Sequence, residues 1–377
     1  MPAANAADYY LLVLMLTKGI GAKLMRRLLD AFDDDARAAA KAPEAELCKL
    51  LPKKVAARVC RKEGEAAVEA AMKWSEQSDE HKLLVVGGDE YPQRLTHCSD
   101  APLVLYASGQ NPRILNADII AIVGSRSASP AGVHNAEVFA RTLSLSNIAV
   151  ASGMAQGIDA AAHQGAIDGG AGTIAVVGTG PDIVYPREHR KLAMRIRETG
   201  MIIGELPPGT PPDKFNFPPR NRIISGIARG CLVIEAGEKS GALITARHAM
   251  DNSREVFAVP GSINSPMHRG CHKLIKEGAK LTETINDIAE ELSAENKING
   301  DGINGAANAG DANANANGDG GVFDDILPHI DYEPTAADDI AGRSGMTAAA
   351  LMPALLELEM QGKIAAAAGG KYQRLPG

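Results

Sequence analysis

The chain has 377 residues and a formal net charge of -7, with 45% hydrophobic, 23% charged and only 4% aromatic residues. This length exceeds what a single hydrophobic core usually supports, so two or three domains are expected. The acidic balance disfavours a protein that coats nucleic acid with its whole surface, but it is compatible with a local basic groove. Because the N-terminal segment has no basic region before an apolar run and no run long enough to cross a bilayer, we expect a cytoplasmic protein without membrane association.

Residues 1–80 are predicted to form a small helical domain, SAM-like or helix-hairpin-helix-like. Between residues 8 and 75, apolar positions recur three and four residues apart, as they do on the buried face of a helix. The break TKGIG separates the first two helical stretches. Such a break is typical of an ordinary helix–helix turn and also of a helix-hairpin-helix, in which backbone amides hold a DNA phosphate.

From residue 118 onward, short apolar runs rich in β-branched residues alternate with helical stretches. Nearly all-apolar strands are typical of a sheet covered on both faces, and the intervening helices fit right-handed crossovers between parallel strands. Residues 81–293 are therefore predicted to form an α/β domain with a Rossmann-like, doubly wound parallel sheet. The predicted strands are IIAIVG, IAVASG, TIAVVG, MIIGEL, CLVIEA and EVFAVPG, and the helices between them cover residues 130–145, 158–169, 187–198, 220–228 and 240–251.

Small and polar residues follow these predicted strands. Ligands of doubly wound sheets bind beyond the carboxyl ends of the strands, where glycines let a ligand approach the backbone and free amides favour an anion. The first loop reads GSRSASPAG, with Arg126 where the second glycine of GxGxxG would face a pyrophosphate, so NAD and FAD are not expected and no cofactor is predicted. The candidate anion-binding residues at these strand ends are Gly124, Ser125, Arg126, Ser152, Gly153, Lys239 and Ser240.

The segment KFNFPPRNRIISG, residues 214–226, gathers two phenylalanines and three cations around two prolines. We expect a loop stiffened by proline, followed directly by a helix. Cations beside an exposed ring are typical of single-stranded nucleic acid binding, in which stacking contributes about 1–3 kcal/mol per base. Alternatively, both rings are core residues, and Arg220 and Arg222 pair with acids such as Glu205 and Glu235. In an extended chain the two rings point to opposite faces, so one is expected to be buried and one exposed.

The composition changes abruptly after the predicted sheet. Residues 294–321 are rich in Asn, Gly, Ala and Asp and lack large apolar side chains, which is typical of a flexible linker. Residues 322–377 predict a winged-helix module, with helices over residues 335–343 and 347–361 and then a short hairpin. The second of these helices carries two glutamates and no Lys or Arg, so phosphate repulsion disfavours its reading duplex DNA.

Six motifs in order resemble the DprA/Smf family of DNA-processing proteins of bacterial natural transformation. They are YPQRL with APLVLYASG, IVGSRSASPAG, SGMAQGIDAAAH, TIAVVGTGPDIVYPREH, GELPPGTPPDKFNFPPRNRIISGIARG, and VIEAGEKSGALITARHA followed by VFAVPGSI. The resemblance implies a homodimeric, cytoplasmic protein that binds and protects incoming single-stranded DNA, loads RecA onto it and displaces single-strand-binding protein. It also implies that Phe217 is the exposed ring. The implied DNA contacts are Arg126, Arg187, Lys214 and Phe217, with Arg220, Asn221 and Arg222 beside them.

The family is not known for enzymes, but a nucleotide-processing enzyme of a related fold is the alternative. A nucleoside-monophosphate phosphoribohydrolase could use Glu205, Glu235 or Glu238 as acid or nucleophile. Such enzymes carry a GGxGTxxE loop, whereas this chain has AGEKSGALITA. The five cysteines are scattered, with no CxxC pair or Cys/His cluster at metal-ligand spacing, so no metal is expected. The expectation is a non-catalytic binder of single-stranded DNA.

Overall fold

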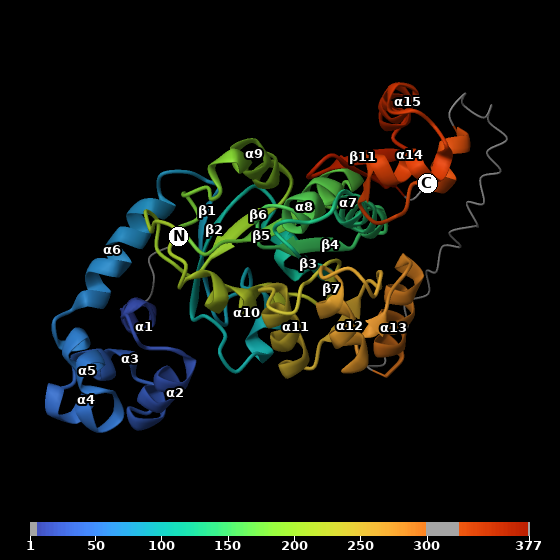
Figure 1. Cartoon of the computed structure of the whole chain (residues 1–377). Coiled ribbons are helices and arrows are strands. Elements are labelled where there is room, and N and C mark those ends of the chain that lie inside the picture. Colours follow the sequence, from blue (N-terminus) through green and yellow to red (C-terminus); the bar gives the residue numbers. More distant parts are fainter. Residues whose placement is uncertain (1–5, 299–323, 376–377) are drawn as a thin grey trace.

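The computed structural model of the chain describes residues 6–298 and 324–375. Figure 1 shows a group of N-terminal helices at one end, a central sheet with helices on both sides, and a C-terminal module beside α7 (Pro130–Leu145) and α8 (Ile158–Gly169). The predicted fold class is confirmed: a mostly parallel α/β core lies between a small helical domain and a winged helix. Within the described residues, no helix is long and apolar enough to cross a membrane.

The N-terminal domain is built from short helices that bury a shared core, in which Leu14, Leu28 and Leu47 are fully buried. Leu103 and Val104, where β2 (Val104–Ser108) begins, belong to the same cluster, so this domain packs on the edge of the sheet. The helices are α1 (Ala6–Leu16), α2 (Ala22–Ala31), α3 (Ala36–Lys41), α4 (Glu44–Leu50), α5 (Lys53–Cys60) and α6 (Glu63–Ser75).

The sheet of the core follows the order β1-β2-β6-β5-β4-β3-β7-β8-β9. All six predicted strands are present and run parallel to one another. They are β3 (Ile119–Val123), β4 (Ala149–Ser152), β5 (Thr173–Val176), β6 (Met201–Gly204), β7 (Gly230–Val233) and β8 (Glu255–Ala258). Three strands that the sequence did not reveal extend the edges: β1 (His81–Val85) and β2 (Val104–Ser108), which pair antiparallel, and the two-residue β9 (Lys280–Leu281).

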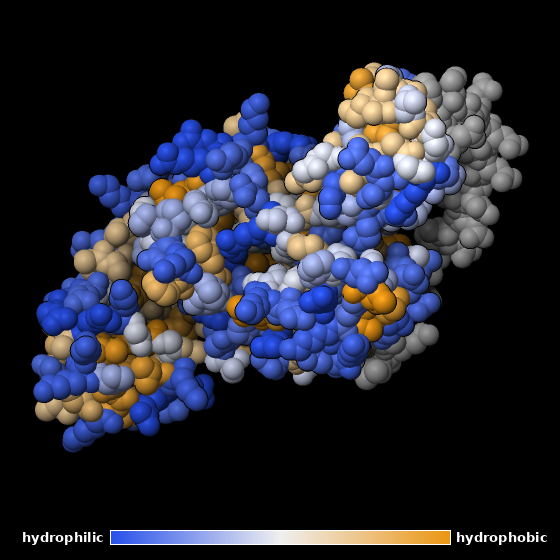
Figure 2. All heavy atoms as spheres, in the orientation of Figure 1, coloured by the Kyte–Doolittle hydropathy of each residue, from blue (hydrophilic) through white to orange (hydrophobic). Residues whose placement is uncertain are grey.

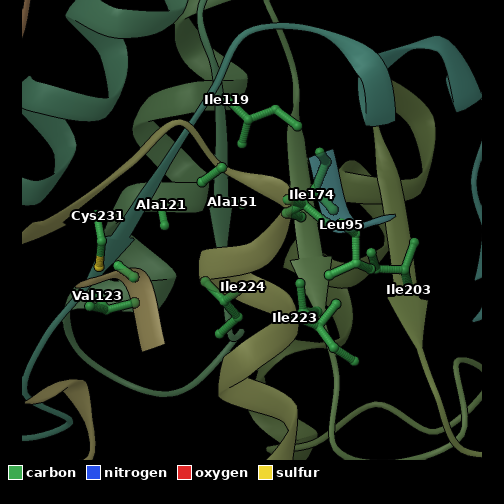
Figure 3. Packing of buried hydrophobic residues seen from close by; sticks show 14 of the residues in the cluster. Leu95, Ile119, Ala121, Val123, Ala151, Ile174, Ile203, Ile223, Ile224 and Cys231 are labelled. Carbon is green, nitrogen blue, oxygen red and sulfur yellow. The ribbon is translucent and has the colours of Figure 1, made fainter. Parts of the chain in front are cut away.

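The two faces of the sheet are covered by different helices (Figure 1). Along β3, Ile120 and Ile122 belong to the cluster that faces α7, whereas Ile119, Ala121 and Val123 pack with α10 and α11 on the other side. Figure 3 shows this second side, with side chains of α10 directed at the strands. Burial on both faces explains why the strand sequences are almost entirely apolar. The helices are α7 (Pro130–Leu145), α8 (Ile158–Gly169), α9 (Arg190–Thr199), α10 (Phe217–Ile227), α11 (Ala242–Asp251), α12 (Arg269–Lys276) and α13 (Ile285–Ile298).

The start of α10 differs from the prediction. The sequence suggested a proline-stiffened loop and a helix from residue 220, but α10 begins at Phe217, with Pro218 and Pro219 in its first turn. The first turn tolerates proline because its N–H groups have no partner within the helix. Asn216 has a helical conformation, with φ of -86° and ψ of -23°. The chain between the two phenylalanines is therefore not extended, and the expectation that their rings point to opposite faces does not apply.

The C-terminal module has the predicted winged-helix elements. They are β10 (Thr335–Ala336), α14 (Ala337–Ser344), α15 (Ala348–Met360), β11 (Ile364–Ala367) and β12 (Lys371–Arg374). A small core that includes Ile340, Leu351 and Leu355 holds these elements together. The surface over α15 is coloured toward the hydrophobic end in Figure 2, and Met360 is 78% exposed. Helix α13 continues to Ile298, past the predicted start of the linker, and the rest of that predicted linker lies outside the described residues.

Candidate functional site

Two adjoining pockets form a groove at the carboxyl ends of the parallel strands. The first, of about 590 Å³, lies between the loop after β3 and the start of α11. The second, of about 510 Å³, lies between the loop after β4 and residues 185–188. Both pockets are lined by Arg126, Ala155, Phe217 and Arg220, which mark their junction. We call the two pockets together the strand-end groove.

At the junction of the pockets, the half-buried Phe217 ring lies between the cation of Arg126 and the ring of Tyr185. The guanidinium carbon of Arg126 lies 5.8 Å from the centre of the Phe217 ring. The Tyr185 ring lies 5.6 Å from the same ring, at an interplanar angle of 35°, and Tyr185 is 44% exposed. A Cβ atom at Gly178 would be 2.9 Å from Cδ1 of Phe217, so glycine allows this ring to lie against the chain. The wall therefore combines aromatic surface with positive charge.

A buried arginine holds the floor of the groove together. Arg220 is only 6% exposed. Its Nη1 donates to the carbonyl oxygen of Gly153 at 2.8 Å and to that of Val176. Asp159 accepts hydrogen bonds from the backbone N–H groups of Gly153 and Ala155, at 3.2 and 3.3 Å. Together these contacts join the ends of β4 and β5 to the first turn of α10, which carries Phe217.

Arg220 and Asp159 stabilise each other's charge. Burial lowers the pKa of Arg220 to about 10, and the nearby Asp159 carboxylate opposes that change. Burial raises the pKa of Asp159, while Arg220 and the backbone N–H groups favour its charged form. The sequence predicted Arg220 as a phosphate contact at the surface. The structure places it in the floor instead, where backbone carbonyls accept its hydrogen bonds, and a direct phosphate contact stays a prediction.

Most other predicted residues line the strand-end groove. Exposed cations outnumber exposed acids in its lining, with Arg126, Arg187 and Lys239 against Glu188. Gly124, Ser125, Asn221, Lys239 and Ser240 line the first pocket, and Gly153 and Arg187 line the second.

Arg222 points away from the groove. Its Nη2 donates to both carboxylate oxygens of Glu205, at 2.8 and 2.7 Å, and its Nε lies 3.5 Å from Asp100. It lines a different pocket, between the N-terminal helices and the core. For Arg222, the geometry matches the alternative drawn from the sequence, in which the arginine pairs with a carboxylate.

Ser152 and Lys214 also lie outside the two pockets among the described residues. Ser152 is fully buried, and its hydroxyl donates to the carbonyl oxygen of Ile122 at 2.6 Å. The Lys214 ammonium lies 5.1 Å from the centre of the Phe215 ring. Phe215 is 73% exposed, so it and not Phe217 is the more exposed of the two rings, contrary to the expectation from the family resemblance.

Several groups at the groove were not predicted from the sequence. Tyr185 precedes Arg187 in the motif VYPREH, and its aromatic ring was the available signal. Met267 lines the first pocket from the loop before α12, where no motif marked it. Asp159 lies in the floor, and only its place after a glycine near a strand end hinted at a role.

The three carboxylates considered for an enzyme do not gather in the groove. Glu205 pairs with Arg222, and Glu235 is buried, accepting hydrogen bonds from the hydroxyl of Ser129 and from its N–H at 3.0 Å. Glu238 is exposed, and none of the three lines either pocket. In the described part of the chain, no group of three or more His, Cys, Asp or Glu residues is placed to hold a metal ion.

Fold and site together define a Rossmann-like protein with a cationic, aromatic-walled groove at the strand ends, suited to a polyanion with flat groups. Comparison with known proteins names the family. Residues 82–293 match the family described as DNA recombination-mediator protein A, and residues 311–370 match the DprA winged helix domain. The chain belongs to this DprA/Smf family.

Individual relatives agree with this assignment. Protein Smf of Escherichia coli is 37% identical over 313 residues, which cover 82% of this chain and 81% of that protein. DNA processing protein DprA of Streptococcus pneumoniae is 44% identical over 204 residues, covering 54% of this chain and 72% of that protein.

Solved structures resemble the chain in the same way. The X-ray structure of DprA from Streptococcus pneumoniae covers 75% of this chain and 97% of its own, with a TM-score of 0.65 and 33% identity. The structure of DNA processing protein A from Helicobacter pylori, described for its single-stranded DNA binding mode, covers 57% and 97%, with a TM-score of 0.51 and 25% identity.

Proposed function

We propose that this protein is a recombination mediator that binds single-stranded DNA in the strand-end groove. The observation that carries the proposal is the Phe217 ring at the junction of two pockets, with the Arg126 guanidinium at 5.8 Å and the Tyr185 ring at 5.6 Å. Unpaired bases stack on aromatic rings, and adjacent cations neutralise the phosphates between them. The family assignment and the single-stranded DNA binding of the Helicobacter pylori relative support the same function.

Each part of the groove has a role in this proposal. A base stacks on Phe217, and the exposed cations Arg126, Arg187 and Lys239 neutralise phosphates on either side of it. Lys214 and Phe215 extend the same chemistry beyond the pockets, at the segment that leads into α10. The geometry favours an unpaired strand, because the ring must reach the face of a base.

The proposal includes a role beyond binding. The protein protects incoming single strands in the cytoplasm during natural transformation, loads RecA onto them and displaces single-strand-binding protein, acting as a homodimer and without catalysis. These functions follow from the family resemblance, and the groove supplies the contact with DNA that each of them needs.

Fluorescence polarisation of labelled oligonucleotides tests the binding step. We expect the protein to bind oligo-dT more tightly than a duplex of the same length, and to bind both more weakly as salt rises, because phosphate contacts release counterions. Equal affinity for duplex would contradict recognition of an unpaired strand. Free nucleoside monophosphate that binds as tightly as the oligonucleotide would instead favour the enzyme alternative.

RecA loading has a separate test. RecA filament growth on oligo-dT covered by single-strand-binding protein is followed by the DNA-dependent ATPase activity of RecA. We expect the protein to shorten the lag before steady hydrolysis. An unchanged lag, at protein concentrations that saturate the oligonucleotide, would restrict the function to strand binding.

A further inference from the structure

Helix α15 of the winged-helix module is apolar on its exposed side as well as on its buried side. The buried side packs in the module with Leu351, Ala354, Leu355 and Leu358. On the exposed side, Met352, Leu356 and Met360 are 50%, 59% and 78% exposed. Figure 1 shows α15 on the side of the module away from the core, and Figure 2 shows apolar residues over it. The helix therefore presents a second apolar face that no described element covers.

The exposed apolar residues form one stripe along the helix. At 3.6 residues per turn, an arc of about 100° contains Ala349, Met352, Pro353, Leu356 and Met360, all of them exposed. We call these five residues the outer stripe. The steps from 349 to 353, 356 and 360 are four, three and four residues, which is the spacing of a contact seam between two packed helices. Glu357 and Glu359 lie at the two edges of the arc.

The other long helix of the module shows what an ordinary surface helix looks like here. Helix α14 exposes Asp338, Asp339 and Arg343 and buries Ile340. A helix that is apolar all round is typical of one that is covered all round, and a contiguous exposed apolar patch marks an interaction site. The outer stripe of α15 is therefore expected to have a partner.

The chemistry of the stripe disfavours two partners. Helix α15 has two glutamates and no Lys or Arg, so it offers nothing to the phosphates of a nucleic acid. Residues 299–323 of the same chain are mostly Asn, Gly, Ala and Asp, and their large apolar side chains are Ile303, Val322 and Phe323. This composition offers few side chains to cover a stripe of three turns.

The stripe is complementary to itself when two copies of α15 run antiparallel. Its N-terminal end is small, with alanine at positions 348–350, and its C-terminal end is large, with Leu356 and Met360. Antiparallel packing places the large end of each helix on the small end of the other, so the side chains interdigitate. Both glutamates lie in the C-terminal half, and the first turn has no acid. Each acidic half then lies beside the positive end of the other helix dipole, whereas parallel packing would gather four glutamates.

We propose that the outer stripe of α15 is a self-association surface, on which the α15 helices of two copies of the chain pack antiparallel. The inference deepens the homodimer that the proposed function includes, because it assigns a surface to it, and it does not involve DNA. A two-fold axis near the middle of the stripe brings Ala349 of one copy to Met360 of the other, and Pro353 to Leu356. The glutamates stay at the edges of the contact, in water.

Sedimentation equilibrium of the full-length chain without DNA is the first test. Leu356→Glu places a charge in the middle of the contact, and the two-fold axis makes it occur twice. We expect it to raise the dissociation constant for self-association by at least about tenfold. Met194→Glu is the matched control, because Met194 is 60% exposed on α9 and its variant adds the same charge. It should stay within about twofold of the parent.

The outcomes separate the inference from the proposed function. If the parent associates and Leu356→Glu associates equally well, the copies meet on another surface, so the inference fails and the homodimer stands. An equal loss for Met194→Glu would assign the effect to net charge and would also overturn the inference. A parent that stays monomeric contradicts both the inference and the homodimer.

Disulfide cross-linking tests the antiparallel direction. Ala349→Cys and Met360→Cys are made separately in a chain in which the exposed Cys48 and Cys60 are replaced by serine. On mild oxidation, an equimolar mixture should form the mixed 349–360 dimer, identified by its intact mass, faster than either protein forms a dimer alone. In the antiparallel pair, two copies of position 360 are roughly 16 Å apart along the axis, which is too far for a disulfide. Faster cross-linking of each protein with itself, or no cross-linking in the mixture, overturns the inference.

Discussion

The floor and the rim of the strand-end groove use the same kinds of residue in different environments. In the floor, Arg220 is 6% exposed and donates to backbone carbonyls beside Asp159. At the rim, Arg126 is exposed and lies over the Phe217 ring. Both arginines come from motifs that the family resemblance marks as DNA-binding, yet only the rim residue keeps its charge free for a phosphate.

A binding motif therefore contains residues that contact the ligand and residues that position them. Burial decides which role an arginine has, because a buried guanidinium must satisfy its donors within the protein. Substitutions in the floor should therefore lower the stability of the fold, and substitutions at the rim should lower affinity for DNA with little loss of stability.

The largest expected effect is that of Arg220→Met. The substitution keeps the volume of the side chain but leaves the Asp159 carboxylate buried without its cation. Removal of one partner of a buried charge pair costs about 3–5 kcal/mol. We expect the free energy of unfolding, measured by urea denaturation, to fall by about that amount.

Arg187→Met is the matched control for this variant, since Arg187 is an exposed arginine of the same groove. Its effect on unfolding should stay within about 0.5 kcal/mol. Adding Asp159→Asn to Arg220→Met should recover part of the lost stability, because no unpaired charge then remains buried. If Arg220→Met lowered DNA affinity and left the stability intact, Arg220 would belong to the rim.

A second buried group near the floor predicts how stability depends on pH. His163 is fully buried, and burial lowers its pKa to about 3. The Thr173 hydroxyl donates to the Val150 carbonyl, so the N–H at Nδ1 of His163 donates to Thr173, while Nε2 has no partner among the described residues. Protonation of this ring therefore requires the buried site to accept a charge that nothing in contact with Nε2 stabilises.

The sign of the pH effect follows from the two states. The unfolded histidine has a pKa of about 6.5, so below that pH the unfolded state binds a proton that the folded state does not. The stability contribution is complete above about pH 6.5 and decreases by about 1.4 kcal/mol per pH unit as the pH falls toward 3, or about 2 kcal/mol at pH 5. Parallel urea denaturation of the parent and His163→Gln should show a shallower loss in the variant. If the free energy of unfolding fell equally with pH in both proteins, a group other than His163 would cause the loss of stability.

Much of the fold was predictable because the hydrophobic pattern reports burial directly. The limits of α7 and α8 match the predicted ranges, since their apolar faces and the glycine or proline residues at their ends are local signals. The edge strand β1 was missed because its residues are mostly half-buried and its sequence, HKLLV, is not an all-apolar run. Its pairing with β2 joins residues 19 to 27 positions apart, which local periodicity does not report.

The site was predictable in its location but not in the role of each side chain. Strand ends and glycines predicted a groove at the edge of the sheet where the two pockets lie. Whether Arg220 and Arg222 face a ligand depends on tertiary neighbours, Asp159 for the first and Glu205 for the second, which lie far away in the sequence. The early start of α10 likewise changed which phenylalanine is exposed, and proline is compatible with both the predicted loop and the observed first turn.

At the rim, the more exposed of the two phenylalanines is not the one that lines the groove. Phe215 is 73% exposed but lines neither pocket, whereas the half-buried Phe217 lines both. Loss of a stacking ring costs about 1–3 kcal/mol, so Phe217→Ala should raise the dissociation constant for oligo-dT about 5- to 150-fold. Phe215→Ala should raise it less than about threefold. The opposite ranking in fluorescence polarisation would place the strand outside the pockets, over the more exposed ring.

The smallest expected effect concerns the charge of Arg126, and it appears in the dependence of binding on salt. On a single strand, each phosphate contact contributes about 0.7 to the slope of log K against log salt. Arg126→Ala should therefore reduce the magnitude of the slope by about 0.7, whereas Arg141→Ala, which removes an exposed arginine on α7 outside both pockets, should leave it unchanged. Because both variants change the net charge equally, an equal change of slope would show that the whole field of the protein attracts the strand. A smaller slope for Arg126→Ala alone would assign the phosphate contact to the rim.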